Sequence, residues 1–504
     1  MTTAAPKSEP RAEPRTAAAG LLRKFTVLKG APRELWLTFA IKFLGITAYK
    51  VTNLTLVLWL SSDFGYSDQK ALGLVVAWSL SMTVFTLLVG SLTDAVGLRK
   101  TFFLGVWLCL VARTVMVFTT VKWLAVAGGL VPLAMGEALG TPVLIAAVRR
   151  YSNTRQRSVS FSLFYTIMNV GFLLASFIFD YIRQGLGEHG HLTLPLVNTT
   201  LTTYRTLFFV SLIVEVTLLP FVYFLRRGAE ATDEGLKLTP VQAKYPQANL
   251  WNSFRFSVRD SVRDTARLFG GLLQQAGFYK LIAFLMLIAF LKLIFMMMDY
   301  VYPTFGIREL GPGAPVGRVS AINNILIILL APLIGALTQR FTAYTMVVVG
   351  GAISAASVFI MALPAAWFEP LANGLLGQWV GHGYLRLTGA VHPYYVMSFL
   401  FVVLLSFGEA FYSPRVYEYA AAIAPKGQEA SYGALSYVPF LLAKMLAGTV
   451  SGALMAKYCP ALGVRDSAIM WLVIALAAAI APVGLILLRR FIRVHEVGRE
   501  DRNP

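Results

Sequence analysis

The stretch Gly90-Ser91-Leu92-Thr93-Asp94-Ala95-Val96-Gly97-Leu98-Arg99-Lys100 joins two long apolar runs of the chain. Its glycines permit neighbouring helices to approach closely, and its carboxylate can interact with cations or with the positive end of a helix. A pair of basic residues at the end of such a connector is typical of the cytoplasmic side of a membrane. We therefore predict a loop between two membrane-spanning helices, in which Gly90, Asp94, Gly97, Arg99 and Lys100 form a latch on one conformation.

Similar apolar runs recur along the whole chain. A hydrocarbon layer of ~30 Å requires about 20 residues of helix. Twelve runs are long enough: 35–60, 71–93, 101–120, 124–148, 158–182, 203–225, 280–304, 319–338, 345–364, 395–421, 431–457 and 466–490. Six lie on each side of a polar centre, so the sequence predicts an all-α membrane protein with twelve transmembrane helices in two six-helix halves.

The composition agrees with a membrane location. Of the 504 residues, 57% are hydrophobic and only 14% are charged, which is more apolar than a soluble domain of this size. The net charge is +19, but the basic residues cluster in short segments between the apolar runs, so they indicate topology and not nucleic-acid binding. Placing both termini in the cytoplasm puts these segments inside. We expect a multi-pass protein of the cell membrane, with a bacterial inner membrane as the leading assignment.

Five parts are expected along the chain. The end of the central polar segment carries Arg255, Arg259, Arg263 and Arg267 at every fourth position opposite an apolar stripe, which predicts an amphipathic helix on the inner membrane face. The parts are a disordered cytoplasmic tail (1–34), the N-terminal six-helix half (35–225), a cytoplasmic linker with the amphipathic helix (226–279), the C-terminal six-helix half (280–490) and a cytoplasmic tail (491–504).

The two halves repeat each other. Gly136-Glu137-Ala138 recurs as Gly408-Glu409-Ala410, with a proline at the same distance downstream, and Leu163 and Tyr165 recur as Leu435 and Tyr437 with the same offset of 272. A weaker similarity relates 90–93 to 335–338 at an offset of 245. Because the two offsets are unequal, the loops of the two halves differ in length. A parallel duplication of six helices follows.

The stretch at 90–100 matches the G-x-L-x-D-x-x-G-x-[KR] signature at every defining position, and the chain therefore resembles the major facilitator superfamily. This resemblance implies two six-helix halves that work by alternating access, with a substrate site at the midplane between them. It also implies that the first helix of each three-helix unit lines the central site.

A finer resemblance points to the proton-dependent oligopeptide transporter family. Phe164-Tyr165-Thr166-Ile167-Met168-Asn169-Val170-Gly171 is similar to the F-Y-x-x-x-N-x-G motif of that family. Three more stretches agree: Leu56-Val57-Leu58-Trp59-Leu60, Asn323-Asn324 to Pro332, and Gly408-Glu409 with Ser413-Pro414. The family's first helix carries an E-x-x-E-R patch, whereas 35–60 holds only Lys42 and Lys50 as charges, and Thr141 precedes Pro142 where the family has Lys. A divergent relative with a rewired charge network fits this pattern best.

Three carboxylates are candidates for proton coupling: Glu137, Glu409 and Asp299. A carboxyl group in hydrocarbon usually faces a wet cavity, a partner charge or a proton path, and a proton that breaks an ion pair can bias a conformational equilibrium. The alternatives are structural: permanent pairing of Glu137 with Arg113, pairing of Glu409 with Lys444, and an interfacial position for Asp299.

Candidates for substrate binding are Lys50, Tyr165, Asn169 and Arg415. Charges of both signs on the helices that line the site suit an anionic or zwitterionic solute. Tyr165 and Asn169 lie one turn apart, and Arg415 follows Pro414, where a helix break frees backbone groups. Polar residues in such helices more often join helices than bind ligands, so that alternative stays open.

Taken together, these features favour a secondary active transporter, with proton-coupled symport of a small polar or charged organic solute as the leading function. A proton-coupled exporter of amphiphilic compounds and a transporter-like receptor or scaffold without coupling are the alternatives. No nucleophile–base pair, phosphate loop or metal cluster suggests an enzyme, a cofactor or a metal site, and His189 and His191 support a metal weakly. We expect a monomer whose partners are the solute, protons and the lipid bilayer, without nucleic acid.

Overall fold

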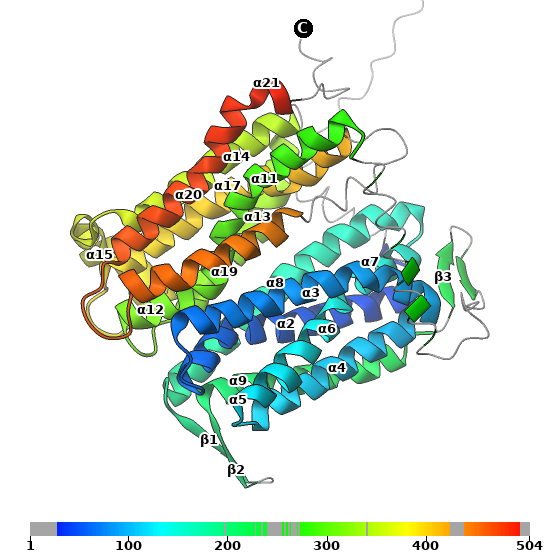
Figure 1. Ribbon diagram of the computed structural model, residues 1–504, viewed down its shortest axis with the longest axis horizontal. Helices are drawn as coiled ribbons and strands as arrows, with labels where there is room; N and C mark the ends of the chain where they lie inside the picture. The colour runs from blue at the N-terminus through cyan, green and yellow to red at the C-terminus, as the bar shows by residue number, and fades with distance from the viewer. Residues whose placement is uncertain are drawn as a thin grey trace, which may run out of the picture.

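The computed structural model describes residues 28–195, 198–226, 228–232, 235–238, 252, 255–256, 259–260, 263, 270, 273–338, 341–423 and 438–493. They form a bundle of long helices in two halves, one above the other in Figure 1. The predicted N-terminal tail up to residue 27, the C-terminal tail from residue 494 and most of the predicted amphipathic helix lie outside the described residues.

The described residues of the N-terminal half form nine helical segments in chain order, with a short hairpin before the last of them. Its elements are α2 (Arg33–Ser62), α3 (Asp68–Val96), α4 (Leu98–Phe118), α5 (Lys122–Leu124), the π-helix η2 (Ala125–Leu130), α6 (Val131–Ala138), α7 (Gly140–Arg150), α8 (Thr154–Leu186), the antiparallel strands β1 (His191–Leu194) and β2 (Thr199–Thr202), and α9 (Thr203–Tyr223). A second antiparallel hairpin, β3 (Ala229–Thr232) and β4 (Gly235–Leu238), opens the predicted linker.

The C-terminal half repeats this order with different connections. Its elements are α11 (Ala276–Tyr300), α12 (Tyr302–Leu310), α13 (Val316–Leu337), α14 (Ala343–Phe359), the 3-10 turns η3 (Ile360–Ala362) and η4 (Ala365–Phe368), α15 (Glu369–Asn373), α16 (Leu375–Gly377), the π-helix η5 (Gln378–Tyr384), α17 (Pro393–Ile423), α19 (Val438–Tyr458), α20 (Ser467–Leu487) and α21 (Arg489–Ile492). Each of the twelve predicted spans therefore overlaps a helix.

Ten helices of the described part are long and apolar enough to cross a membrane. Two further long helices, α3 and α19, contain 29 and 21 residues, and some of their side chains lie outside the described part. Both carry polar side chains, among them Ser79 and Thr83 on α3 and Lys444 on α19, and the two helices pack against each other across the interface between the halves. Their polar residues thus belong to an interhelical contact.

Two of the predicted spans are not single helices. The span 124–148 is divided into η2, α6 and α7, because Pro142 cannot donate the backbone hydrogen bond that would continue the helix across Leu139. The span 280–304 is interrupted at Val301, after which α12 begins at Tyr302 with Pro303 in its first turn and continues to Leu310. Asp299 is the last residue but one of α11, and α12 continues the helical path beyond it.

Glycines explain the duplicated Gly-Glu pattern. A Cβ added to Gly136 would lie 2.6 Å from Cys109 Sγ and 2.8 Å from the Gly105 carbonyl oxygen, so only glycine lets α6 pack this closely on α4. Gly408 of α17 packs in the same way against Gly350 and Ser354 of α14. The pairs Gly105/Cys109 and Gly350/Ser354 are related by the offset of 245. The glutamate that follows each glycine is thereby turned away from this contact.

The change of offset from 245 to 272 has a structural cause. Residues 119–121 join α4 to the next helix, whereas 360–392 occupy the same place in the C-terminal half and contain η3, η4, α15, α16 and η5. Exposed apolar side chains mark this insertion, including Trp367 at 67%, Leu375 at 86% and Trp379 at 65% exposure.

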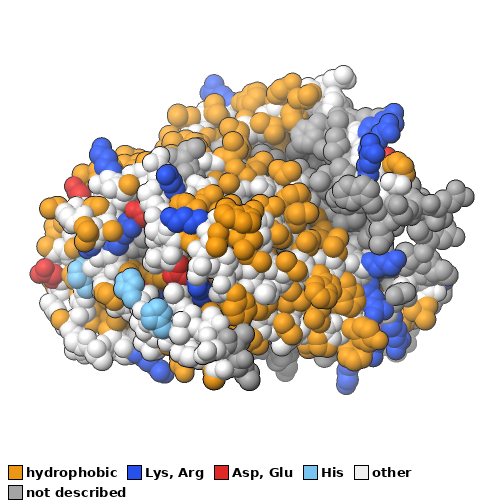
Figure 2. Space-filling view, turned by 60° about the horizontal axis from the view of Figure 1, so that its bottom comes forward, with side chains coloured by type: hydrophobic (Ala, Val, Ile, Leu, Met, Phe, Trp, Pro, Cys, Tyr) orange, Lys and Arg blue, Asp and Glu red, His pale blue; other side chains and the backbone are white. Residues whose placement is uncertain are grey.

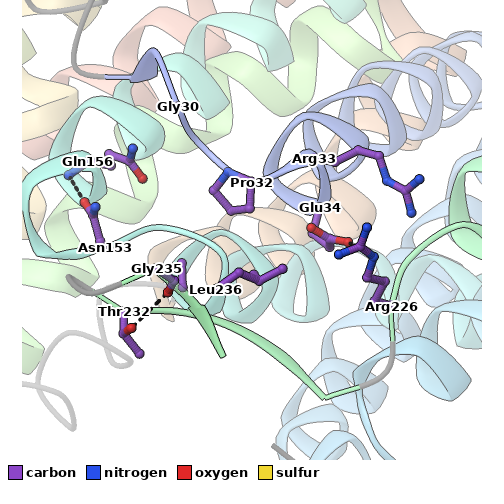
Figure 3. A pocket seen from close by; sticks show the side chains of 11 residues that line it. Gly30, Pro32, Arg33, Glu34, Asn153, Gln156, Arg226, Thr232, Gly235 and Leu236 are labelled. Atoms are coloured by element: carbon purple, nitrogen blue, oxygen red, sulfur yellow. Dashed lines mark hydrogen bonds and ion pairs between the residues drawn. The ribbon is translucent and has the colours of Figure 1, made fainter. Parts of the chain in front are cut away.

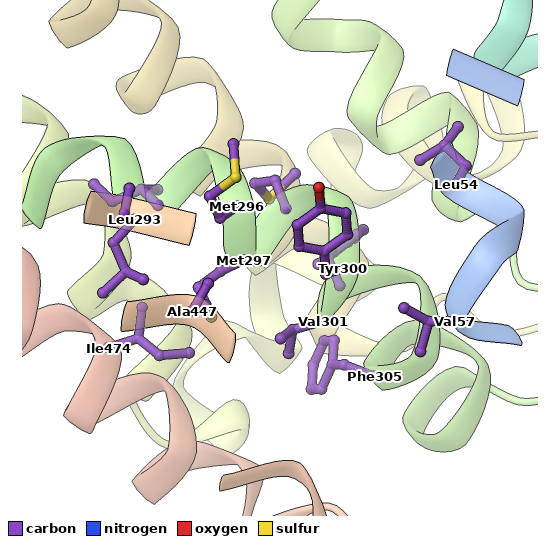
Figure 4. Close-up of a cluster of buried hydrophobic side chains, with 14 of the residues drawn as sticks. Leu54, Val57, Leu293, Met296, Met297, Tyr300, Val301, Phe305, Ala447 and Ile474 are labelled. Carbon is purple, nitrogen blue, oxygen red and sulfur yellow. The ribbon is translucent and has the colours of Figure 1, made fainter. Parts of the chain in front are cut away.

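The two ends of the bundle differ. The halves approach each other at the end that carries α12 and diverge toward the end that carries α7 and α14 (Figure 1); we call the first the closed end and the second the basic end. Figure 2 shows hydrophobic side chains across the middle of the visible face, with Lys and Arg toward both ends; toward the left they are accompanied by His and most of the visible Asp and Glu, and toward the right-hand, basic end they are not. Near the closed end, buried residues of α2, α11, α12, α19 and α20, among them Met297, Phe305 and Ala447, form one core across both halves (Figure 4).

Candidate functional site

A buried charge cluster lies in the middle of the N-terminal half. The Arg113 guanidinium, fully buried on α4, donates to Glu137 Oε1 at 2.6 Å and lies 3.3 Å from Glu215 Oε2. Its Nε donates to Ser211 Oγ at 2.8 Å, and Ser211 Oγ in turn donates to the Ala48 carbonyl oxygen of α2 at 3.0 Å. The predicted pairing of Glu137 with Arg113 is therefore present. Glu215, which the sequence analysis did not single out, is the second carboxylate of the cluster.

Lys42 of α2 completes this cluster. Its side chain is buried, its ammonium lies 4.6 Å from the centroid of the Phe164 ring, and it interacts electrostatically with Glu137. Two cations, Lys42 and Arg113, thus balance two carboxylates, Glu137 and Glu215. Such a balance is what a low-dielectric site requires if its charges are to remain ionised.

The corresponding site in the C-terminal half is simpler. Glu409 Oε2 accepts a hydrogen bond from Asn323 Nδ2 at 2.9 Å, and the carboxylate interacts electrostatically with Lys292 of α11. The Lys292 ammonium donates to Ser413 Oγ at 3.2 Å and lies 5.0 Å from the centroid of the Tyr412 ring. Each half therefore joins a lysine of its first helix to a glutamate of its fourth.

The two glutamates differ in their cationic partners. By the offset of 245 that relates α4 to α14, Arg113 corresponds to Val358, which is buried and apolar. Glu137 consequently has a guanidinium in direct contact, whereas Glu409 has an amide in contact and a more distant ammonium. The ionised form of Glu137 is the better stabilised of the two.

A third pair joins the halves. Lys50 Nζ of α2 donates to Asp299 Oδ1 of α11, and Asn53 Nδ2 donates to Asp299 Oδ2 at 3.2 Å. The Lys50 side chain is 9% exposed and that of Asp299 is 23% exposed, so the pair borders accessible space. Two residues predicted for different roles, substrate binding and proton coupling, are therefore one ion pair across the interface.

The closed end is held by further contacts between the halves. Asp180 of α8 accepts hydrogen bonds from the backbone N–H groups of Gly317 at 2.9 Å and Arg318 at 2.6 Å, at the start of α13. Arg308 of α12 binds the carboxylate of Asp68 with two nitrogens, at 2.7 and 2.6 Å.

Glu188 adds a polar contact just beyond the end of α8. Its carboxylate pairs with Arg183 and accepts from the backbone N–H of Gly313 at 3.2 Å. Burial alone would raise the pKa of Glu188, but the Arg183 guanidinium, the Tyr204 hydroxyl and the Gly313 amide together hold it below its ordinary value. Glu188 therefore remains a carboxylate through the range of mildly acidic pH.

Lys444 does not pair with Glu409, so that predicted alternative is wrong. Its ammonium donates to the Ser79 carbonyl oxygen at 3.4 Å and to Thr83 Oγ1 at 3.2 Å, both on α3 of the opposite half. The sequence places Lys444 and Glu409 on helices of one half, but it does not fix the rotation of α19, which turns the lysine toward α3.

The other predicted substrate residues do not converge on one point. Asn169 is buried and donates to the Tyr165 carbonyl oxygen of its own helix at 3.0 Å, while the Tyr165 side chain is 42% exposed. Arg415 is buried and donates to Thr338 Oγ1 at 3.0 Å, near the end of α13. The Arg415 contact therefore joins α17 to the end of α13, which was the alternative for such residues, whereas the Asn169 bond lies within α8.

The predicted latch at 90–100 is mostly helical. Gly90 and Asp94 lie in α3, and Arg99 and Lys100 lie in the first turn of α4, so the predicted loop shrinks to Gly97 alone. Gly97 has φ +87°, a conformation that favours glycine. The Arg99 guanidinium lies 5.2 Å from the centroid of the Tyr223 ring, and Lys100 is exposed. The side chain of Asp94 is outside the described part.

A pocket of about 430 Å³ lies at the basic end and is separate from these charge pairs. Figure 3 shows the Arg226 guanidinium beside the Glu34 carboxylate, with an Nε–Oε1 distance of 3.4 Å, between the start of α2 and the β3–β4 hairpin. None of the predicted site residues lines it. Among the residues that the structure describes, no group of three His, Cys, Asp or Glu side chains could hold a metal ion.

Comparisons with known proteins extend over most of the chain. The family model described as Major Facilitator Superfamily matches residues 37–384. A search of curated proteins finds no match by sequence.

Solved structures resemble the fold at low sequence identity. A POT family transporter in complex with 5-aminolevulinic acid has a TM-score of 0.67 and 14% identity, over 92% of this chain and 97% of that one. The peptide transporter POT in complex with sulfate has a TM-score of 0.65 and 15% identity, over 94% and 99%. A structure described for substrate recognition in proton dependent oligopeptide transporters has a TM-score of 0.64 and 18% identity, over 91% and 99%. At these identities the likeness concerns the fold.

Proposed function

Because the chain belongs to the Major Facilitator Superfamily, we propose that this secondary transporter carries out proton-coupled symport of a small polar or charged organic solute by alternating access. The observation that carries the proposal is the Glu409 site in the middle of α17, where a partly buried carboxylate accepts a hydrogen bond from the Asn323 amide and interacts with the Lys292 ammonium. A single proton there changes the charge balance of the C-terminal half.

The asymmetry between the halves assigns different roles to the two glutamates. Glu137 stays ionised because Arg113 contacts it directly, so its cluster serves to hold α2, α4, α6 and α9 together. Glu409 has weaker stabilisation of its charge and exchanges the proton. When Glu409 takes up a proton, the negative charge beside Lys292 disappears, and the C-terminal site becomes more positive, which favours a solute with an anionic group.

The Lys50–Asp299 pair is the gate in this mechanism. It joins the first helix of each half, and with Asp180 at the start of α13 it keeps the halves together at the closed end. The basic end lies in the cytoplasm under the positive-inside rule, because it carries Arg33, Lys100, Arg149, Arg150, Arg226 and Arg490. In this proposal the closed end faces outward, and the closed arrangement is the state that is sealed on the outside of the membrane.

Ligands of similar folds set the first solutes to test. One neighbour was solved with 5-aminolevulinic acid, a molecule with an amino and a carboxyl group, and another with a thioalcohol conjugated peptide. The lysine–carboxylate pairs of this chain offer both signs of charge, which suits solutes of that kind. Peptides themselves are not the leading candidates, since α2 supplies lysines where the resembled family has its E-x-x-E-R patch.

Proteoliposomes with an imposed pH gradient test the function. We expect accumulation of one class among amino acids, short peptides and organic acids when the exterior is acidic, and its loss in Glu409→Gln. Proton-driven movement in the opposite direction would favour an exporter. Binding without counterflow or pH-driven uptake would favour a receptor or scaffold and overturn the proposal.

A further inference from the structure

Lys444 is a buried cation at the interface between the halves. Its side chain comes from α19, only 8% of the residue is exposed, and its two described hydrogen bonds both end on α3. One acceptor is the Ser79 carbonyl oxygen and the other is the Thr83 hydroxyl, so neither carries a charge. Any separation of α3 from α19 removes both partners at once.

Lys444 differs in this respect from the other lysines at this depth. Lys50 pairs with Asp299, and Lys42 and Lys292 interact electrostatically with Glu137 and Glu409. Within the described ranges, Lys444 has no ion pair with a carboxylate, and two of its three N–H groups have acceptors. A buried charge without a counter-ion costs several kcal/mol, whereas a counter-ion from a ligand would recover that cost.

Lys444 lies where the tight contact between α3 and α19 ends. A Cβ on Gly452 would lie 2.8 Å from the Gln69 Cα, so the two backbones touch near the closed end. Lys444 is eight residues deeper, or about 12 Å along the helix. The Tyr300 hydroxyl, which follows Asp299 in the chain, donates to Ser79 Oγ at 3.5 Å.

The same layer therefore holds Lys444 beside the gate. Figure 4 shows Ala447, one turn from Lys444, packed near Met297 and Tyr300 of α11. Lys50 and Asp299 cancel each other's charge, so among the described side chains of this layer the positive charge of Lys444 is in excess. An anionic group is the ligand chemistry that neutralises it.

We propose that Lys444 binds the anionic group of the transported solute, a carboxylate or another small oxyanion. The proposal deepens the proposed function and rests on it, because it names the charge that the solute must carry. When the halves separate at the closed end, the Lys444 ammonium loses its hydrogen bonds to Ser79 and Thr83 and donates to the solute anion instead. Uncharged analogues such as amides lack that contact and are transported poorly.

Cysteine labelling tests the anion site without a known solute. The full-length protein carries Cys109→Ala and Cys459→Ser, with Thr83→Cys as a reporter beside the ammonium and Thr86→Cys as a matched reporter one turn away. The probes are the anionic reagent MTSES, the cationic reagent MTSET and inorganic sulfate. Because a unit charge acts strongly over a few ångströms, we expect the MTSES-to-MTSET rate ratio at Thr83→Cys to fall about tenfold in Lys444→Gln. At Thr83→Cys the rate ratio should keep its original value in Lys444→Arg. At the more distant Thr86→Cys, Lys444→Gln should change the rate ratio less.

Sulfate separates binding from simple attraction. We expect sulfate to slow the reaction of Thr83→Cys with the uncharged reagent methyl methanethiosulfonate when residue 444 is Lys or Arg, and to have no effect in Lys444→Gln. An unchanged rate ratio in Lys444→Gln, or no protection by sulfate, would overturn the proposal and leave Lys444 as a contact between helices only. Because labelling requires no transport, absence of pH-driven uptake with an intact sulfate effect would reject the proposed function and keep the anion site.

Discussion

Asp180 of α8 caps the first turn of α13 through the backbone N–H of Gly317, at 2.9 Å and across the interface between the halves. The residue before α13 is Pro315, whose side chain cannot act as a cap, so the helix takes its capping carboxylate from the other half. A Cβ on Gly317 would collide with the Ser176 carbonyl oxygen. The Asp180 carboxylate and the close packing of Gly317 on α8 both require the halves to be together, so this contact exists only in the closed arrangement.

Loss of this cap is expected to open the closed end. Asp180→Asn removes the charge and weakens the bonds to α13, which should cost ~1–2 kcal/mol of closure, a shift of about tenfold. Gly317→Ala prevents the close approach and should shift the population further. Spin labels on His189 and Glu369, both exposed near the closed end, report the separation by electron–electron distance measurement.

Tyr181→Phe is the control for that experiment, because Tyr181 follows Asp180 but is 77% exposed. It should leave the distance distribution unchanged. If Asp180→Asn also leaves it unchanged while Gly317→Ala widens it, the carboxylate does not contribute to closure.

Arg113 is expected to be the residue of the N-terminal cluster that tolerates substitution least. Arg113→Gln leaves Glu137 and Glu215 buried without their common cation, a change that typically costs 3–5 kcal/mol, so we expect an apparent melting temperature many degrees lower. The triple variant Arg113→Met, Glu137→Gln, Glu215→Gln removes all three charges and should recover most of the loss. Thermal unfolding in detergent, followed by size-exclusion chromatography, measures both. A triple variant as unstable as the single one would contradict the electrostatic explanation.

Much of the helical arrangement could be predicted from the sequence, since apolar length fixes where helices cross a membrane. Pairing of Arg113 with Glu137 was one of two alternatives for that carboxylate, and the structure contains it. The rotation of each helix, by contrast, decides which polar residue meets which, and apolar runs on all sides of a helix do not reveal it. For this reason the sequence left Lys444 as an alternative partner of Glu409, and it does not single out Glu215 inside the run 203–225.

The insertion at 360–392 illustrates a different difficulty. Two unequal offsets, 245 and 272, indicated a longer loop in one half but not its place or its structure. The close packing of Gly136 on Gly105 and of Gly408 on Gly350 shows that the offset changes between α14 and α17. Contacts of this kind between two helices can be recognised only in the structure, where both helices are placed relative to each other.

Lys50 and Asp299 are expected to act as one unit. Lys50→Asp places two carboxylates together, and Asp299→Lys places two ammonium groups together. Either repulsion should open the gate and abolish pH-driven uptake. The exchange of both, Lys50→Asp with Asp299→Lys, restores an attractive pair. Residues in direct contact commonly show coupling energies of 0.5–3 kcal/mol, so a double-mutant cycle on the closed fraction measures the interaction. Additive effects of the two substitutions would indicate that the contact does not control the gate.

Glu188 should stabilise the closed end without responding to mild acid. Since the folded pKa of Glu188 lies below its ordinary value, its contribution is present above the unfolded pKa and is lost only as pH falls through the lower, folded pKa. Thermal stability of the wild type should exceed that of Glu188→Gln by the same amount at pH 8 and at pH 5.5. A difference that disappears at pH 5.5 would place a proton on Glu188 and make it a coupling residue.

Glu409 and Glu137 should separate in their dependence on pH. Glu409→Gln can still accept a hydrogen bond from Asn323, so the protein should fold with a melting temperature close to that of the wild type. Solute counterflow, which requires no net proton movement, should persist, while accumulation driven by a pH gradient should fall at least tenfold. Glu137→Gln leaves Arg113 with Glu215 as its partner and should lower stability while the pH profile of the remaining uptake stays that of the wild type. If Glu137→Gln flattens the pH profile and Glu409→Gln does not, the proton is exchanged in the N-terminal half. The absence of an arginine at Val358, the position that corresponds to Arg113, would then not determine where coupling occurs.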